Sequence, residues 1–319
     1  NNNTAVGRSA LLANTTGTEN TALGSFALAA NTTADTNTAL GAYSLQSNTT
    51  GAGNTAGGRL ALQSNTTASN NTAFGLRALT ANTTGAQNTA VGQGALDANT
   101  TGAVNSAFGK DALGANTTGE NNVAVGRRAL LMNTTASNNT AVGTAALQEN
   151  TTGADNNALG RNALDANTTG DDNTAIGSLA LTSNTTASNN TAVGYNSLAA
   201  NTTGTRNIAL GSEALDASTT ANDNTALGVS ALGSVSTGNA NTALGSSAGF
   251  SVSIGSNNLL LGYNSGSSSS PFHVTSDNNH VVIGDNNITN AFIKVDWTVT
   301  SDERDKADIT DFTKGLDII

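Results

Sequence analysis

The chain has 319 residues and a net charge of −10, with 3% aromatic and 11% charged residues and no cysteine. The negative balance argues against nucleic acid or an anionic membrane as a partner, since both need a basic face. The lack of cysteine excludes disulfides and thiolate metal sites. No apolar run of about 18 residues occurs, so we expect no membrane insertion.

Residues 1–265 consist of a seventeen-residue unit. Glycine recurs at this spacing from Gly7 to Gly262, and asparagine stands four residues before each of these glycines, from Asn3 to Asn258. The consensus is N-T-A-[LV]-G-x-x-A-L-x-x-N-T-T-[GA]-x-x. Such repeats are typical of stacked architectures in which each unit contacts its neighbours. The fixed phase of leucine argues against a disordered Gly- and Asn-rich chain.

Each unit predicts one coil of a β-solenoid. Thr-Ala-Val-Gly and Ala-Leu read as two short strands separated by a glycine corner, and Asn-Thr-Thr-Gly reads as a longer turn. Helices are disfavoured because Thr, Asn and Gly are poor in helix interiors. We therefore expect an all-β, parallel β-solenoid of sixteen coils, about 75 Å long at roughly 4.8 Å per coil.

Stacking places identical side chains above one another, so we expect columns. Asparagine columns can form amide ladders, and the glycines form a column of corners. N-T-T is also an N-glycosylation sequon, but turn geometry explains its regular recurrence better. The structural columns begin with Asn3, Asn20, Asn37, Gly7, Gly24, Gly41, Asn14 and Thr16.

The apolar residues predict self-association. Neighbours such as Ala5 and Val6, or Ala10 and Leu11, point to opposite faces of a strand. One face would line the coil interior, and the other would leave an apolar stripe in water. An exposed stripe of this length marks an interface, and we expect a parallel homotrimer to cover it. The trimer or core stripe begins with Val6, Leu11, Leu23, Leu28, Leu40 and Leu45.

The variable positions give no ligand site. The positions equivalent to Arg8 and Glu19 hold residues of every kind, and we expect them at solvent-facing corners. His273 and His280 stand seven apart without a carboxylate pattern, so no metal site is predicted, and no cofactor is expected. A glycan-degrading enzyme would need paired carboxylates in a groove, and no such pair is evident.

Three further segments follow the repeats. Residues 266–278 read as a Ser-rich linker with the only proline, residues 279–300 as a short C-terminal β cap, and residues 301–319 as the start of another domain. An open solenoid end has unpaired backbone groups that need a cover. We expect Phe272, Phe292, Trp297 and Phe312 to provide it. The sequence opens within a repeat, so we expect the natural protein to continue upstream.

The last forty residues resemble a known family. HVVIGDNNITNAFIKVDWTVTSDERDKADITDFTKGLDII, with its S-D-x-R-x-K core at 301–306, resembles the junction before the endosialidase-type intramolecular chaperone (S74 peptidase family) of phage tail fibres and tailspikes. The resemblance implies a chaperone that trimerises, assists folding and then cuts itself off before Ser301. Ser301 would be the nucleophile and Lys306 its general base. We expect most of that domain to follow Ile319.

The repeats resemble, more loosely, the head repeats of trimeric autotransporter adhesins, which form left-handed parallel β-rolls. The first functional hypothesis is the shaft of a homotrimeric phage tail fibre in the virion, which supports attachment to a host receptor or glycan. It would not be an enzyme apart from self-cleavage. The alternative is a bacterial surface adhesin whose repeats bind matrix or glycan, weakened by the scarcity of aromatic residues. Ice binding through flat threonine ladders is a third hypothesis.

Overall fold

The computed structural model describes residues 2–291, and this range contains strands and turns but no helix. Each strand is three residues long. The strands are β1 (Thr4–Val6), β2 (Thr21–Leu23), β3 (Thr38–Leu40), β4 (Thr55–Gly57), β5 (Thr72–Phe74), β6 (Thr89–Val91), β7 (Ser106–Phe108), β8 (Val123–Val125), β9 (Thr140–Val142), β10 (Asn157–Leu159), β11 (Thr174–Ile176), β12 (Thr191–Val193), β13 (Ile208–Leu210), β14 (Thr225–Leu227), β15 (Thr242–Leu244), β16 (Leu259–Leu261) and β17 (Val281–Ile283).

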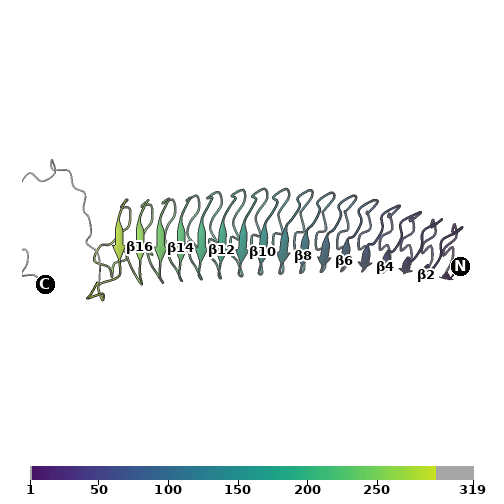
Figure 1. Cartoon of the computed structure of the whole chain (residues 1–319), viewed down its shortest axis with the longest axis horizontal. Helices are drawn as coiled ribbons and strands as arrows, with labels where there is room; N and C mark the ends of the chain where they lie inside the picture. The colour runs from purple at the N-terminus through teal and green to yellow at the C-terminus, as the bar shows by residue number, and fades with distance from the viewer. Residues whose placement is uncertain (1, 292–319) are drawn as a thin grey trace, which may run out of the picture. The chain divides into compact units, whose positions relative to one another are not determined.

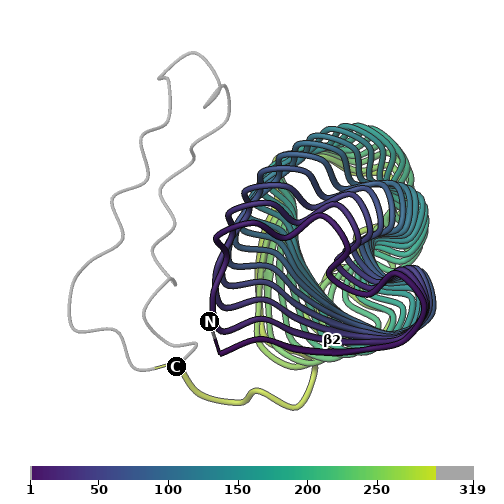
Figure 2. The same ribbon diagram turned by 90° about the vertical axis from the view of Figure 1, so that its right-hand side faces the viewer.

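Each strand from β2 to β16 pairs in parallel with the strands of the preceding and following coils, and β1 and β17 each pair with one neighbour. Thr38 of β3 lies opposite Thr55 of β4, and the same register holds along the stack up to β16 and β17, where Leu259 lies opposite Val281. The coils stack along one direction (Figure 1), and the view turned by 90° shows them one behind another, each slightly displaced from the one before it (Figure 2). The prediction of an all-β parallel solenoid is confirmed.

The prediction of a second strand in each coil is wrong. The Ala-Leu segment forms turns, and its leucine takes a left-handed conformation, with φ of 51° at Leu28 and 49° at Leu45. In this conformation the side chains of the alanine and the leucine both point into the coil instead of to opposite faces, so Ala27 and Leu28 are both fully buried. Leu28 and Leu45 therefore lie in the core and form no exposed stripe. Leu11, in the first coil, is half-buried and packs against this core.

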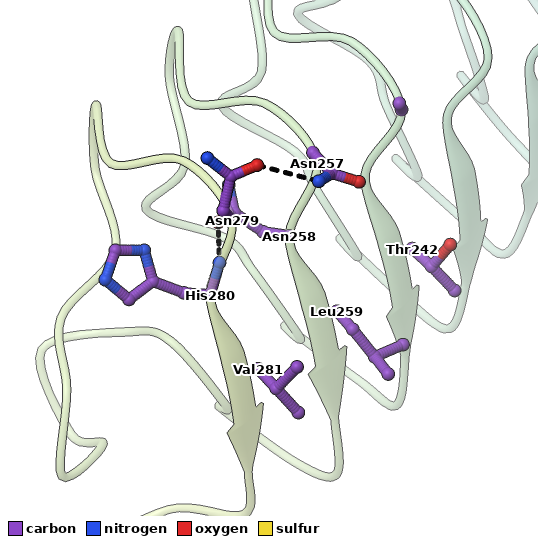
Figure 3. Close-up of a pocket in the computed structure, with 8 residues that line it drawn as sticks. Thr242, Asn257, Asn258, Leu259, Asn279, His280 and Val281 are labelled. Atoms are coloured by element: carbon purple, nitrogen blue, oxygen red, sulfur yellow. Dashed lines mark hydrogen bonds between the residues drawn. The ribbon is translucent and has the colours of Figure 1, made fainter. Parts of the chain in front are cut away.

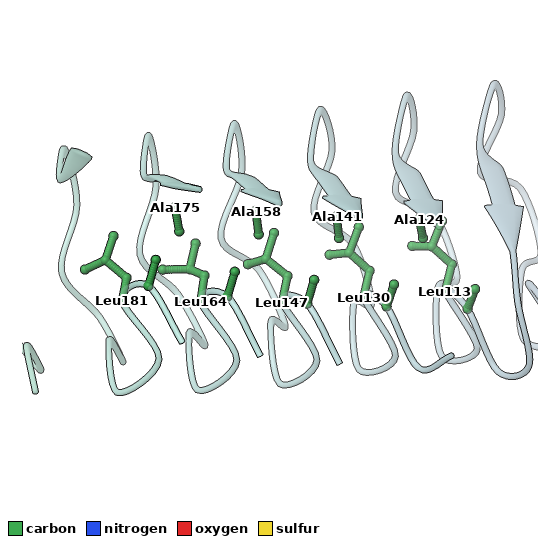
Figure 4. Packing of buried hydrophobic residues seen from close by; sticks show 14 of the residues in the cluster. Leu113, Ala124, Leu130, Ala141, Leu147, Ala158, Leu164, Ala175 and Leu181 are labelled. Carbon is green, nitrogen blue, oxygen red and sulfur yellow. The ribbon is translucent and has the colours of Figure 1, made fainter. Parts of the chain in front are cut away.

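The core is a narrow column of small side chains around one leucine per coil. Leu113, Leu130 and Leu147 follow one another in successive coils, with Ala124 and Ala141 of the strands facing them (Figure 4). A left-handed leucine costs about 1–2 kcal/mol. Burying this side chain contributes about 1.5–3 kcal/mol, so burial offsets the strain of the leucine itself.

The glycine that follows each strand up to β16 is required by both conformation and space. Gly126 has a φ of +135°, a region that L side chains rarely adopt. A Cβ atom there would lie 2.5 Å from the carbonyl oxygen of Gly143 in the next coil. Any larger residue would therefore push neighbouring coils apart.

The final coil is longer than the others and includes the segment expected to be a linker. Val274 is fully buried, and its N–H donates a 2.9 Å hydrogen bond to the carbonyl of Gly266. Residues 266–278 thus form an enlarged turn of the solenoid that leads into β17. Phe272 is 44% exposed and stacks on His280 with ring centroids 4.6 Å apart. Phe292, Trp297, Phe312 and residues 301–319 lie outside the described residues.

The buried leucine gives a direct test of the core. We expect Leu130→Ala to lower the stability of its region by about 2–5 kcal/mol, because the stacked coils cannot collapse onto the cavity. Met132→Ala, in the same coil but 41% exposed, is the control and should cost less than about 1 kcal/mol. Urea unfolding followed by circular dichroism measures both, and equal losses would contradict this packing.

Candidate interaction surface and the ladders behind it

The second asparagine column is a continuous amide ladder inside the solenoid. Nδ2 of Asn116 donates to Oδ1 of Asn99 in the preceding coil (2.8 Å) and to the carbonyl of Gly119 (3.0 Å). The same pair of bonds recurs from Asn31 to Asn201. The ladder satisfies polar groups that are fully buried, which would otherwise be costly.

The first asparagine column is bonded differently. The N–H of Asn37 donates to Oδ1 of Asn20 (2.9 Å), and Nδ2 of Asn37 donates across its own coil to the carbonyl of Gly51 (2.9 Å). Nδ2 of Asn48, in the second column, also donates to Gly51 (2.9 Å). The two columns therefore converge on one carbonyl and close each coil, while Oδ1 of the first column ties each coil to the next.

This bonding makes the N-T-T asparagines poor glycosylation acceptors. Asn116 is fully buried and both amide hydrogens have acceptors. Of the two threonines that follow, Thr117 donates from Oγ1 to the carbonyl of Thr134 (2.9 Å), whereas Thr118 is exposed. The column that begins with Thr16 therefore lies on the surface, beside a bonded threonine column.

The amide ladder ends before the last coils. Position 218 is serine, and Oδ1 of Asn201 and Oγ of Ser218 are buried without a hydrogen-bond partner. Val235, Val252 and Val274 then occupy the column and are fully buried. The interior thus changes from amide to aliphatic toward β17.

The outward side of the sheet carries a column of apolar side chains along the whole stack. In each strand the central residue, usually alanine, points inward, and the first and third residues point outward. The third residues contain no polar side chain in any of the described strands. We call them the outer column: Val6, Leu23, Leu40, Gly57, Phe74, Val91, Phe108, Val125, Val142, Leu159, Ile176, Val193, Leu210, Leu227, Leu244, Leu261 and Ile283.

Most of the outer column is exposed in the single chain, and the half-buried members are Gly57, Val142, Val193, Leu210 and Leu261. Val6 is 56% exposed, Leu23 50% and Leu40 39%, so these three predicted stripe residues lie on the surface. Gly57, the one residue without a side chain, is covered by the ring of Phe74. An apolar surface of this length without a cover is unusual for a soluble monomer.

A shallow pocket of about 360 Å³ lies beside the starts of β15, β16 and β17. Nδ2 of Asn257 donates to Oδ1 of Asn279 (2.7 Å), and the N–H of His280 donates to Oδ1 of Asn258 (3.0 Å) (Figure 3). Thr242, Leu259 and Val281, the first residues of the three strands, line its outer side. The pocket lies beside the outward sheet face, and no Asp, Glu, Lys or Arg lines it.

Residues 2–291 contain no cluster of three or more His, Asp or Glu side chains that could bind a metal ion. Nor does this range contain a helix long and apolar enough to cross a membrane. Ser301 and Lys306, the residues predicted for self-cleavage, lie outside the described residues. No protein-family model, curated protein or solved structure matches the chain significantly.

Adjacent asparagines provide a matched test of the first column. Asn156 is fully buried; its N–H and Nδ2 donate hydrogen bonds and its Oδ1 accepts two from Asn173, whereas Asn157 is exposed. We expect Asn156→Ala to destabilise the solenoid by about 2–4 kcal/mol, because buried partners lose their bonds. Asn157→Ala should change stability by less than about 0.5 kcal/mol. Equal unfolding midpoints in urea would contradict this account of the column.

Proposed function

We propose that the chain forms the shaft of a homotrimeric fibre of the phage tail type, which holds a host-binding tip away from the virion. The observation that carries the proposal is the uninterrupted outer column. Three copies around one axis would bury it along the full length of the stack, and a cyclic arrangement is a common solution for a repeated surface. Burial of each large side chain contributes about 1–3 kcal/mol before entropy.

Stiffness is the second support for the shaft. Backbone hydrogen bonds join neighbouring coils well beyond the strands: the N–H of Leu28 donates to the carbonyl of Ser44 (3.1 Å), and that of Tyr43 donates to Ser25 (2.9 Å). Each coil is thus tied to the next at several points around its circumference. This bonding supports the rigidity that a shaft needs.

Mass in solution tests the shaft proposal. We expect native mass to be three times the 31.5 kDa of one chain, and to fall to one chain in denaturant. Leu159→Lys combined with Ile176→Lys places two charges in the outer column and should shift the native mass towards the monomer.

The matched control changes two residues in the same part of the stack but on another face of the solenoid. Thr169→Lys combined with Thr186→Lys alters two exposed residues of the threonine column and should leave the trimer intact. A soluble, folded wild-type monomer would contradict the proposal, as would equal loss of assembly in both variants.

The resemblance of the last forty residues supports a self-cleaving chaperone as the folding aid. In a chain that carries the complete chaperone domain, we expect release of a fragment that begins at Ser301. Ser301→Ala should abolish the release, because the nucleophile is lost, and Lys306→Ala should do so as well. N-terminal sequencing of the released fragment checks the position. Cleavage at the same bond in the Ser301→Ala variant would remove Ser301 from the mechanism.

A further inference from the structure

The two edges of the outward sheet face carry opposite charges. Because the strands are parallel and in register, residues two or three positions after each strand form one edge, and residues two or three positions before each strand form the other. The first edge holds nearly all the described cations: Arg8, Arg59, Arg77, Lys110, Arg127, Arg128 and Arg161. The acids on this basic edge are Asp111, Glu213 and Asp285.

The opposite edge is acidic. It holds Glu19, Asp35, Glu120, Asp155, Asp171, Asp172 and Asp223, and its one cation is Arg206. Arg206 is bonded to Asp223 on the same edge, with Nε and Oδ1 2.6 Å apart. This bond lowers the pKa of Asp223 and raises that of Arg206. Among residues 2–291, the one positive charge on the acidic edge is therefore neutralised there.

The two edges do not neutralise each other within one chain. The ion pairs of the basic edge are local: Arg77 bonds Asp97 (2.8 Å), and Lys110 lies 3.9 Å from Asp111. Within residues 2–291 no ion pair joins the basic edge to the acidic edge. Arg127 and Arg161 are exposed, as are Glu120 and Asp155. Each edge thus presents charge to a neighbouring molecule.

We propose that these edges fix the polarity of the fibre, so that copies of this chain pack in parallel with their outer columns inward. This inference rests on the proposed self-association. When copies are related by rotation about an axis parallel to the stack, the basic edge of one lies beside the acidic edge of the next. When two copies run in opposite directions, like edges meet and repel. The charges therefore select the parallel fibre and disfavour the antiparallel one.

Rotation about such an axis also brings equivalent coils to the same level. Arg127 and Glu120 flank β8, and Arg161 and Asp155 flank β10. In a parallel assembly Arg127 of one copy faces Glu120 of the next, and Arg161 faces Asp155. These pairs lie at the rim of the apolar contact, where charges set orientation more than affinity.

Disulfide trapping tests the polarity, because the chain has no cysteine of its own. Leu40 and Leu244 lie in the outer column near opposite ends of the stack, at 39% and 47% exposure. Chains with Leu40→Cys are mixed with differently tagged chains with Leu244→Cys, refolded together and oxidised. The parallel fibre predicts disulfides between two positions 40 and between two positions 244.

The outcomes separate this inference from the shaft proposal, since native mass is measured on the same samples. Disulfides between positions 40 and 244, or a random mixture, would overturn the parallel polarity, while a native mass above that of one chain would still show the self-association on which the shaft proposal rests. An oligomer without any disulfide would show that the outer columns do not meet, which also overturns the inference. A folded monomer would overturn the shaft proposal itself.

Charge reversal gives a second test. Arg127→Glu with Arg161→Glu should weaken assembly about tenfold at ~0.1 M salt, with little effect at ~1 M, where screening shortens to about 3 Å. Adding Glu120→Arg and Asp155→Arg should restore assembly, because the facing pairs are rebuilt in reverse. Failure of this rescue in folded protein would overturn the pairing of the edges.

Discussion

The structure depends on the pairing of each coil with an identical neighbour in parallel register. Coils lie about 4.8 Å apart, so whatever one coil places at a position must tolerate the same group directly above and below it. Asparagine satisfies this because its amide both donates and accepts, and the bonds from Asn31 to Asn201 repeat without interruption. Glycine satisfies it where backbones touch, as at Gly126 and Gly143.

The same constraint explains what the sequence could predict. The period and the fixed residues are sufficient for a parallel solenoid, its strand at Thr-Ala-Val and its polar columns. The Ala-Leu strand could not be excluded, because leucine has no intrinsic preference for positive φ. Only the closed coil imposes that conformation, as the φ of 51° at Leu28 illustrates. The linker prediction failed because serines that look flexible in sequence, such as Ser267, are buried in an enlarged coil.

The residues of the candidate interaction surface could be predicted from the sequence only in part, for another reason. The exposed column beginning with Val6, Leu23 and Leu40 follows from simple strand alternation, whereas Leu28 and Leu45 do not alternate and lie in the core. The charged edges were missed because each variable position, taken alone, mixes residue types. The charge separation is present in the sequence, but it emerges only when all residues just after the strands are grouped and their charges are compared with those of the residues just before the strands. That grouping is justified only once a single strand per coil is known.

The interior of the solenoid thus stabilises each coil, whereas its outward sheet face is available for contact with other molecules. The amide ladders and the leucine column complete each coil internally, while the outer column is apolar without an internal partner. The central claim is that copies of this chain cover it. Hydroxyl-radical footprinting can compare three phenylalanines that have similar exposure in a single chain. Phe74 and Phe108 in the outer column are 43% and 42% exposed, and Phe250, outside the strands, is 46% exposed. The account predicts that Phe74 and Phe108 are protected while Phe250 is oxidised; equal oxidation of all three would contradict it.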